Sequence, residues 1–367
     1  MLDHRQRALA TVDLTAVRHN VAYLVSLLSA GTELCAAVKA NGYGHGAVPV
    51  ARAALQAGAS WLGVATVAEA EELREAAITA PLLIFGPLTG VETARAAKAR
   101  AEVTVWSPAF LAEALRRRVR VHVKFNSGMG RLGVNEATAS ALADAAGNRL
   151  SGLMSHFATA DEDDQTFFVE QLERFRALAT QLKASHGGLM VHTANSAATI
   201  REPTSHFDMV RTGIAIYGLS PFGDEPGPHG LRPALSLSSY VAGIREVGPG
   251  ESVGYGRRFI AHRPTRFAIV PIGYADGVAR ALTNRGDVLI SGRRCRITGT
   301  ISMDLLTVML PDDSEAVRLG DEVVFIGRSG SEHILAEDVA RLLGTITHEI
   351  VCGLPPRVVR RYLEAPA

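Results

Sequence analysis

The chain has 367 residues, more than one hydrophobic core usually supports, so two domains are expected. Hydrophobic residues make up 47% of the chain and charged residues 20%, which is ordinary for a globular protein and too apolar for disorder. The formal net charge of +1 gives no electrostatic support to nucleic-acid or anionic-membrane binding, so a small molecule is the expected partner.

The first two thirds of the chain predict an α/β fold with a parallel sheet. Short apolar runs alternate with Ala-, Leu- and Glu-rich stretches of helical period, the clearest helix being 165–184. Eight such repeats close most simply as a TIM-type (β/α)8 barrel, although a doubly wound open sheet has the same periodicity. The eight strands are expected at Leu34–Val38, Trp61–Ala65, Leu82–Phe85, Val103–Trp106, Val121–Phe125, Leu150–His156, Leu189–Thr193 and Met209–Ala215.

The last third predicts a mainly antiparallel β domain. The stretch SPFGDEPGPHGLRP is dense in Pro and Gly, so the domains are expected at 1–230 and 231–367, and the first ten or so residues could pair with the β domain. One helix is expected, at Ala336–Leu343. Alternating segments separated by Gly-containing turns predict strands at Leu235–Val247, Phe267–Ile272, Asp287–Ile290, Arg294–Gly299 and Glu322–Ile326.

Cysteine usage and hydropathy indicate the cellular setting. Cys35, Cys295 and Cys352 are widely spaced, with no CxxC pair and no metal-ligand spacing, so reduced thiols and no metal are expected. No apolar region follows the basic residues near the N-terminus, and no run approaches the roughly 18–20 apolar residues of a membrane span. A cytoplasmic protein that binds neither membrane nor nucleic acid is therefore expected.

Reactive side chains follow five of the eight predicted barrel strands, which is where active sites of such barrels lie. Lys39 follows the first strand within a stretch with glycines at 42, 44 and 46, and the preceding apolar run CAAV would draw its stem into the barrel mouth. A lysine at a strand end is more often a solvated surface group, but a desolvated amine is what a Schiff-base lysine needs. The other strand ends carry Lys124 and Arg131, His156, His192 with Asn195 and Ser196, and Arg211 with Gly213.

The loops after the seventh and eighth strands are the usual phosphate site of this fold. Ser196 offers a hydroxyl there, and Gly213 and Ile214 offer backbone amides. Ser196 could also be a helix N-cap, and both roles can coexist because a helix N-terminus attracts phosphate.

Eight motifs in one order identify the chain as resembling alanine racemase along nearly its whole length. The resemblance implies pyridoxal 5′-phosphate (PLP) as cofactor, interconversion of L-alanine and D-alanine, supply of D-alanine for peptidoglycan, and a homodimer with active sites shared across the interface. The motifs are VKANGYGHG, VKFNSGMGRLGV, SHFATADE, VHTANSAAT, MVRTGIAIYG, VGYG, VPIGYADG and ISMD.

The resemblance also implies a role for each matching residue. Lys39 is similar to the Schiff-base lysine and to the base for one enantiomer, and Tyr255 to the base for the other. Tyr255 would meet His156, and His156 would meet Arg211, the partner of the pyridine nitrogen. Taken alone, His156 and His192 would be interpreted as core histidines.

Further positions match the family's substrate, cofactor and supporting residues. Arg131 resembles the arginine that binds the substrate carboxylate, helped by Met303 of the partner chain. Lys124 resembles a carbamylated lysine that positions Arg131. Tyr43 and Ser196 match phosphate contacts, while Tyr274 and Asp304 match residues of the substrate access channel and interface; Tyr274 and Met303 could equally be β-domain core.

Two positions differ from many family members, and two other functions remain open. Asn126 stands where many members have Asp, and Pro356 stands where some have Tyr. The alternatives are a PLP-dependent decarboxylase or broader-specificity racemase of the same architecture, and a non-catalytic PLP-binding protein. Carbon dioxide release would favour the decarboxylase, and PLP binding without proton exchange would favour the carrier.

Overall fold

The structure is a computed structural model that describes residues 6–312 and 316–364. These residues form two compact units. The barrel unit comprises 16–222 and 226–232, and the β unit comprises the described residues up to Thr15, 223–225 and those from Pro233 onward. Of the predicted N-terminal segment, residues 1–5 lie outside the described part.

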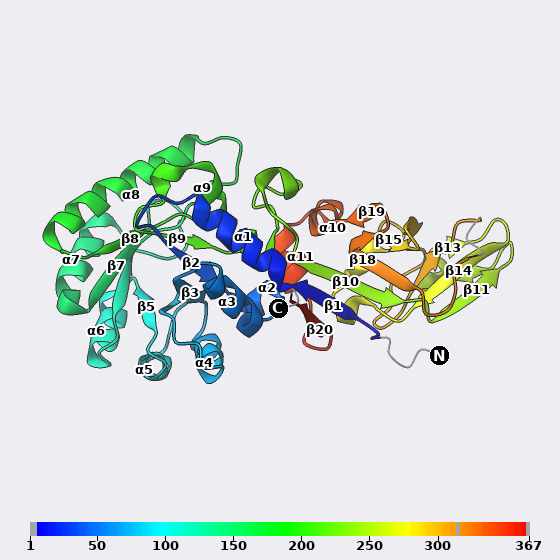
Figure 1. The fold of residues 1–367 in the computed structure, drawn as a ribbon, viewed down its shortest axis with the longest axis horizontal. Coiled ribbons are helices and arrows are strands. Elements are labelled where there is room, and N and C mark those ends of the chain that lie inside the picture. The colour runs from blue at the N-terminus through cyan, green and yellow to red at the C-terminus, as the bar shows by residue number, and fades with distance from the viewer. Residues whose placement is uncertain (1–5, 313–315, 365–367) are drawn as a thin grey trace. The chain divides into compact units, whose positions relative to one another are not determined.

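The barrel unit contains one parallel sheet of eight strands with helices on its outside (Figure 1). Its edge strands β8 and β9 approach each other through two hydrogen bonds, from the Asp208 N–H to Val191 O at 3.0 Å and from the Arg211 N–H to Ala194 O at 2.9 Å. The sheet is therefore nearly closed, and the predicted TIM-type barrel is confirmed. In spatial order the strands are β8 (Met190–His192), β7 (Leu150–Met154), β6 (Val121–Lys124), β5 (Glu102–Val105), β4 (Leu82–Ile84), β3 (Trp61–Val64), β2 (Glu33–Ala37) and β9 (Met209–Thr212).

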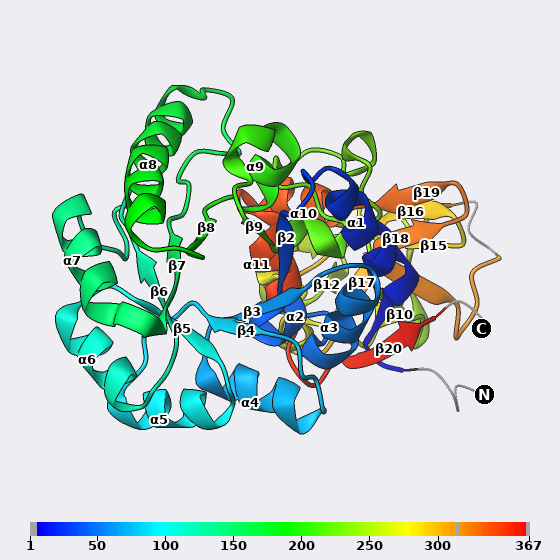
Figure 2. The same cartoon turned by 60° about the vertical axis from the view of Figure 1, so that its left-hand side comes forward.

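Several of the helices that follow the strands begin at well-formed N-caps. Thr66 and Thr89 form capping boxes, and Ser107 caps a helix whose first residue is Pro108. Figure 2 shows α4 to α7 following one another around the outside of the sheet. The helices are α1 (Leu14–Ser26), α3 (Ala47–Gln56), α4 (Val67–Glu75), α5 (Gly90–Lys98), α6 (Pro108–Arg116), α7 (Glu136–Ala146), α8 (Thr166–Ser185) and α9 (Ser196–Arg201).

The helix predicted at 165–184 is confirmed as α8, and its apolar stripe is buried as the spacing indicates. Part of the barrel interior is an apolar cluster of Cys35, Trp61, Leu83 and Met209. Burial raises the pKa of the Cys35 thiol to about 12, so this thiol stays protonated.

The β unit is mostly antiparallel, as predicted. Its largest sheet has the order β16-β15-β18-β10-β1-β20, with β19 pairing β18, and a second sheet has the order β11-β14-β17. Strand β1 (Leu9–Asp13) pairs antiparallel with β10 and parallel with β20. The other elements are β10 (Leu235–Tyr240), β11 (Gly243–Val247), β12 (Ser252–Val253), β13 (Phe259–Ile260), β14 (Thr265–Val270), β15 (Asp287–Ile290), β16 (Arg293–Arg296), β17 (Leu306–Met309), β18 (Glu322–Ser329), β19 (Glu332–Ile334), α10 (Ala336–Leu343), α11 (Thr347–Cys352) and β20 (Val359–Leu363).

Several details of the β unit differ from the sequence-based expectation. Strands β12, β13, β17 and β19 were not predicted. The single strand expected at Leu235–Val247 is two strands, β10 and β11, which belong to different sheets. A second helix, α11, follows the predicted α10. Strand β20 has no buried residue, so its sequence VRRYL lacks the apolar alternation that reveals a strand.

No helix in the described ranges is long and apolar enough to cross a membrane. The same residues contain no group of three His, Cys, Asp or Glu side chains placed to hold a metal ion.

Candidate functional site

Lys39 lies directly beyond β2, in a turn with unusual backbone geometry. It begins the short helix α2 (Lys39–Tyr43), in which Ala40, Asn41 and Gly42 have φ of 51°, 53° and 59°. Tyr43 continues this left-handed run with φ of 50°. Non-glycine residues are strained in this region, so such a run indicates a site whose surroundings hold it in place.

Three side chains from different elements hold this turn. Glu69, in the first turn of α4, accepts a hydrogen bond from the Ala40 N–H at 2.6 Å. The Asn41 side chain accepts from the Ala47 N–H at 3.0 Å, and the Tyr217 hydroxyl donates to a carbonyl of β2 at 2.9 Å. The direction in which Lys39 leaves the strand is therefore fixed by the surrounding barrel.

Arg211, on β9, is an almost completely enclosed cation of the site, with 6% of its surface exposed. Its guanidinium donates to the Ser155 carbonyl at 2.7 Å and the Thr193 carbonyl at 3.2 Å. It also contacts two imidazole nitrogens, His192 Nδ1 at 2.7 Å and His156 Nδ1 at 3.3 Å. Burial lowers the pKa of Arg211 to about 10, which still leaves it charged near pH 7.

The two histidines that contact Arg211 are held neutral. Burial first, and then the charge of Arg211, lower the pKa of His156 and of His192 well below the usual value. The charges of Lys124, Arg131 and Lys39 also contribute to lowering the pKa of His156. The structure thus brings the residues expected at the ends of the first, fifth, sixth, seventh and eighth strands into one electrostatic neighbourhood.

The loops after β8 and β9 meet at Ser196. Asn195 is the N-cap of α9, its side chain accepting from the Ala198 N–H at 3.0 Å, and Ser196 is the first helical residue. The Ser196 hydroxyl oxygen accepts from the Gly213 N–H at 3.0 Å. The sequence suggested that the Gly213 amide is free, but it is engaged by Ser196. Ile214 begins the next short helical turn.

Gly213 also marks a close approach between Tyr43 and β9. A Cβ atom at Gly213 would lie 2.3 Å from the Tyr43 hydroxyl oxygen, which no real Cβ tolerates. The Tyr43 ring stacks on Tyr217 with centroids 4.9 Å apart, and Lys39 Nζ lies 6.0 Å from the Tyr43 ring centroid. Tyr43, Ser196 and Gly213 therefore lie around one point beside Lys39.

The loop after β6 presents Arg131. The loop closes on its own strand through two backbone hydrogen bonds, from the Val134 N–H to Lys124 O at 3.0 Å and from the Asn126 N–H to Val134 O at 2.9 Å. Asn126 organises the loop, since its side-chain oxygen accepts from the Gly128 N–H at 3.2 Å and the Gly130 N–H at 2.9 Å. The departure at Asn126 is thus compatible with a well-ordered loop.

Lys124 ends β6 and is almost completely buried, with 6% of its surface exposed. Burial, followed by the charges of Arg211, Arg131 and Lys39, lowers the pKa of the Lys124 amine to about 8. A substantial fraction of the amine is therefore neutral under mildly alkaline conditions.

Tyr255 and Tyr274 of the β unit are both hydrogen-bonded to the segment 300–302, which Met303 follows. Tyr255 follows β12, and its carbonyl accepts from the Thr300 hydroxyl at 2.7 Å. The Tyr274 N–H donates to Ser302 O at 3.1 Å. The Ala275 N–H donates to Met303 O at 3.0 Å. The side chains of Tyr255, Tyr274 and Met303 are 73%, 42% and 52% exposed, so the alternative that Tyr274 and Met303 are β-domain core is wrong.

Asp304 belongs to an ion-pair cluster that sequence reasoning missed. Arg357 contacts Asp304 at 2.7 Å and the buried Asp276 at 3.0 Å, and Arg7 contacts the same two carboxylates at 3.3 and 2.7 Å. The hydrogen bond to Asp304 raises the pKa of Arg357. Pro356 thus precedes an arginine that stabilises this part of the β unit.

The barrel site fits an anionic cofactor such as PLP. Lys124, Arg131 and Arg211 take part in none of the ion pairs among the described residues, although Arg211 and Lys124 are buried. Buried cations without acidic partners are costly, and a phosphate or carboxylate would offset that cost. The narrow space between Gly213 and Tyr43, next to a helix N-terminus, is suited to a phosphate group.

Sequence reasoning missed the polar residues that support the site from behind. Glu69 and Tyr217 hold the Lys39 turn, and Glu102 and His122 lie behind His192. The strand motif VHVK carried a usable signal, because residues two apart on a strand share a face, so His122 faces the same way as Lys124.

Comparisons with known proteins agree with this geometry. Residues 12–221 match the family model of the alanine racemase N-terminal domain, and 234–362 match that of the C-terminal domain. Alanine racemases of Symbiobacterium thermophilum and Thermobifida fusca are each 42% identical to the chain, covering 98% and 97% of it and 98% of each relative.

Solved structures give the same result. The alanine racemase of a D-cycloserine-producing Streptomyces lavendulae has a TM-score of 0.92 at 38% identity, over 98% of both chains. That of Bacillus anthracis with bound L-Ala-P has a TM-score of 0.91 at 38% identity, over 98% of this chain and 95% of the other. The chain belongs to the alanine racemase family, the PLP-dependent enzymes that interconvert L-alanine and D-alanine.

Proposed function

We propose that this chain racemises alanine with PLP held on Lys39, and that Lys39 and Tyr255 are its two bases. One observation carries the assignment of the site: Lys39, Arg131 and Arg211 converge on Lys124 and His156 at one end of the barrel, and their charges contribute to lowering the pKa of both groups. In this proposal the barrel, residues 1–230 of the expected division, holds the cofactor. The β domain, 231–367, supplies Tyr255 and Met303.

The chain's own residues would hold PLP at three points. Lys39 would hold its carbonyl carbon, Arg211 would face the ring nitrogen, and Ser196, Tyr43 and Gly213 would surround the phosphate. Bound PLP draws electrons away from the amino acid's Cα and makes its proton easier to remove. Because a guanidinium near pH 7 has no proton to give, Arg211 would leave the ring nitrogen unprotonated and restrain that electron withdrawal.

Racemisation needs two proton-transferring groups on opposite faces of Cα, since one base returns the proton to the face it came from. Lys39 would act on one face and Tyr255 on the other. Arg131 suits the substrate carboxylate, because its guanidinium can bond both oxygens. Met303 of the partner subunit would complete this contact.

A homodimer is part of the proposal. Tyr255 is 73% exposed, and the β unit carries further exposed apolar side chains at Tyr274, Met303 and Leu305. Exposed apolar surface is typical of an interaction site where it is contiguous. A second subunit would cover it and receive Tyr255 next to its own His156. A cytoplasmic location and supply of D-alanine for peptidoglycan complete the proposal.

Incubation of purified, PLP-loaded protein with L-alanine in deuterium oxide is expected to abolish optical rotation and place deuterium at Cα. Serine and other amino acids run in parallel measure the strictness for alanine. Release of carbon dioxide would instead identify a decarboxylase, and PLP binding without Cα exchange would identify a carrier protein. Either outcome would contradict the proposal.

Lys124 is expected to make the stability of the cofactor-free protein depend on pH. Its pKa is about 8 when folded and close to 10.4 when unfolded. Below pH 8 both states are protonated and burying the cation destabilises the fold. Between these two pKa values the unfolded chain binds more protons, so the free energy of unfolding contributed by this residue rises with pH, by on the order of 1–3 kcal/mol.

Urea unfolding in CO2-free buffer at pH 7.5 and 10 measures this rise, which should be absent in Lys124→Met.

Carbamylation of Lys124 is also proposed, because the neutral amine is the form that reacts with CO2 and an acquired negative charge would pair with Arg131. A carbamate signal in ¹³C NMR with labelled bicarbonate is expected in the unmodified chain and not in Lys124→Met. Equal signals in both proteins would refute it.

A further inference from the structure

A chain of hydrogen bonds leads from Arg211 through the barrel interior to a carboxylate. Arg211 Nη1 lies 2.7 Å from His192 Nδ1, and His192 Nε2 lies 2.8 Å from His122 Nδ1. His122 Nε2 lies 2.9 Å from Glu102 Oε2. The four residues stand on β9, β8, β6 and β5, so the chain connects strands that are far apart in sequence.

The chemistry of its two ends gives this chain a single direction. A guanidinium only donates, so His192 Nδ1 accepts from Arg211 and the ring proton of neutral His192 is on Nε2. This proton is donated to His122 Nδ1, which places the ring proton of a neutral His122 on Nε2, pointing at Glu102. A carboxylate only accepts hydrogen bonds. Glu102 therefore accepts the proton that Arg211, through His192, places on His122 Nε2.

Glu102 is ionised in this arrangement. Burial raises the pKa of its carboxyl group, but the hydrogen bonds from His122 and the Ser151 hydroxyl and the charge of Arg120 lower it more, so the net change is downward. His122 and His192 are completely buried, and 19% of the Glu102 side chain is exposed. The negative charge thus stands at the outer end of a buried, polarised chain.

The barrel is shaped around the middle of this chain. A Cβ atom on Gly152 of the neighbouring β7 would lie 2.3 Å from His122 Nδ1, so the absence of a side chain there makes room for the ring. Trp61 meets the His122 ring edge-on, with centroids 5.9 Å apart and an interplanar angle of 81°. His122 therefore has little freedom to turn or to change its partner.

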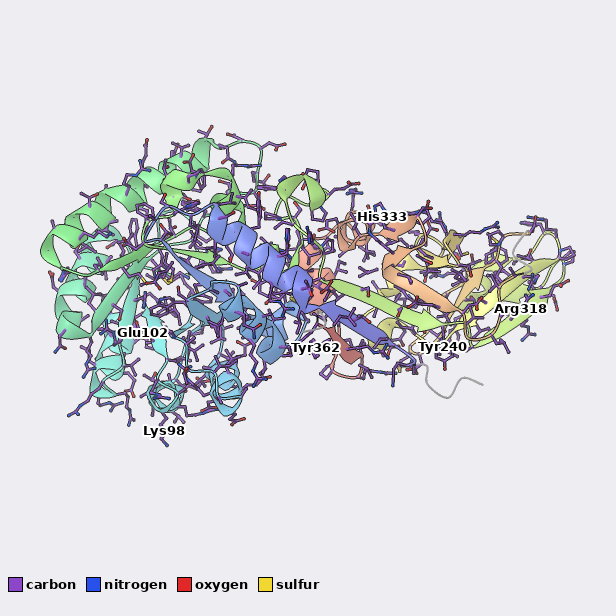
Figure 3. All side chains as sticks on the ribbon, in the orientation of Figure 1. Lys98, Glu102, Tyr240, Arg318, His333 and Tyr362 are labelled. Atoms are coloured by element: carbon purple, nitrogen blue, oxygen red, sulfur yellow. The ribbon has the colours of Figure 1, made fainter. Side chains whose placement is uncertain are left out.

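We propose that Glu102, acting through His122 and His192, is a positioning group for Arg211, fixing the orientation of its guanidinium and supporting its charge from the opposite end of the barrel. Glu102, labelled in Figure 3, is the first residue of β5, whereas Arg211 lies near the C-terminal end of β9. The nearest neighbours of the guanidinium are carbonyl oxygens and imidazoles, so this carboxylate supplies the compensating charge at a distance. The catalytic consequence rests on the proposed function; the tautomer pattern does not.

The first test is made on the cofactor-free protein by ¹⁵N NMR of the histidine side chains. The neutral rings of His122 and His192 are both expected to carry their proton on Nε2. A neutral ring of either residue with its proton on Nδ1 would overturn the proposal. This result does not depend on whether the chain racemises alanine.

The second test compares Glu102→Gln with Glu33→Gln. Glu33 is a matched control because it is also the first residue of a barrel strand and also accepts a side-chain hydrogen bond, from Ser60 Oγ at 2.9 Å. The amide oxygen introduced by Glu102→Gln can still accept from His122, so the fold and the tautomers should persist while the charge is lost. We expect the His192 Nδ1 resonance to shift and kcat to fall about tenfold, the factor by which a hydrogen bond to a charged group exceeds one to a neutral group, with the KM for alanine changed less than about twofold.

In Glu33→Gln both the resonance and kcat should match those of the unaltered protein. A Glu102→Gln protein that folds with an unshifted His192 resonance and full kcat would refute the positioning role. If this variant fails to fold, the tautomers of the unaltered protein still decide. Absence of racemase activity in the unaltered protein would contradict the proposed function alone and leave the tautomer test intact.

Discussion

A Lys39→Ala variant is expected to lose racemisation in both directions by at least about 10³-fold, the upper range of what a positioned acid or base contributes. The variant loses both a base and the covalent hold on PLP. The left-handed turn after Lys39 is held by Glu69 and Tyr217, which the substitution leaves in place, so the backbone should be retained. Formation of D-alanine from L-alanine measures the loss.

Lys98→Ala is the matched control, because Lys98 is exposed at the end of α5 on the outside of the barrel (Figure 3). Its activity should equal that of the unaltered chain. Borohydride reduction of the PLP-loaded protein followed by peptide mapping should place the pyridoxyl group on Lys39. A pyridoxyl group on another lysine, or a Lys39→Ala protein with full activity, would show that the assignment is wrong.

The eight barrel strands could be predicted because strands covered on both faces form continuous apolar runs. Their C-terminal ends were predicted one to three residues too long, as in Leu150–His156, where β7 ends at Met154. The chain leaves the sheet at this point to bring His156 toward Arg211. Periodicity does not register such a change, because apolar and β-branched residues continue beyond the last ladder hydrogen bond.

The supporting residues of the site could not be predicted in the same way. Glu102 and His122 meet only because β5 and β6 are neighbours and β8 completes the curve of the barrel. Their partnership depends on strand order and register, which sequence does not contain. The predicted site residues Lys39 and Arg211 were accessible to reasoning because each follows or ends a strand of recognisable pattern.

The β unit was harder for a related reason. Its sheets join segments that are distant in sequence, such as β1 with β20, which are paired from Leu9 with Val359. The break between β10 and β11 falls at 241–242, inside a stretch that is apolar enough to form one strand. Exposure of Tyr274 and Met303 is also invisible in the sequence, where both could equally be core residues.

A Tyr255→Phe variant is expected to lose racemisation by about 10²–10⁴-fold, and by the same factor in both directions. L-alanine and D-alanine are mirror images, so their equilibrium constant is one and kcat/KM must remain equal in the two directions whichever base is removed. The rate of racemisation alone therefore cannot reveal which face Tyr255 serves. Exchange of the Cα proton with solvent can, because it requires only one base.

With Lys39 intact, the Tyr255→Phe variant should still exchange the Cα proton of one enantiomer for deuterium, with retention of configuration, while the other enantiomer exchanges far more slowly. ¹H NMR of each enantiomer in deuterium oxide measures both rates. Tyr240→Phe is the control, because Tyr240 lies in β10 of the same unit and is partly buried (Figure 3), and its exchange should match the unaltered chain. Equal residual exchange of both enantiomers would mean that Tyr255 is not a base for one face, and undiminished racemisation would remove it from the mechanism.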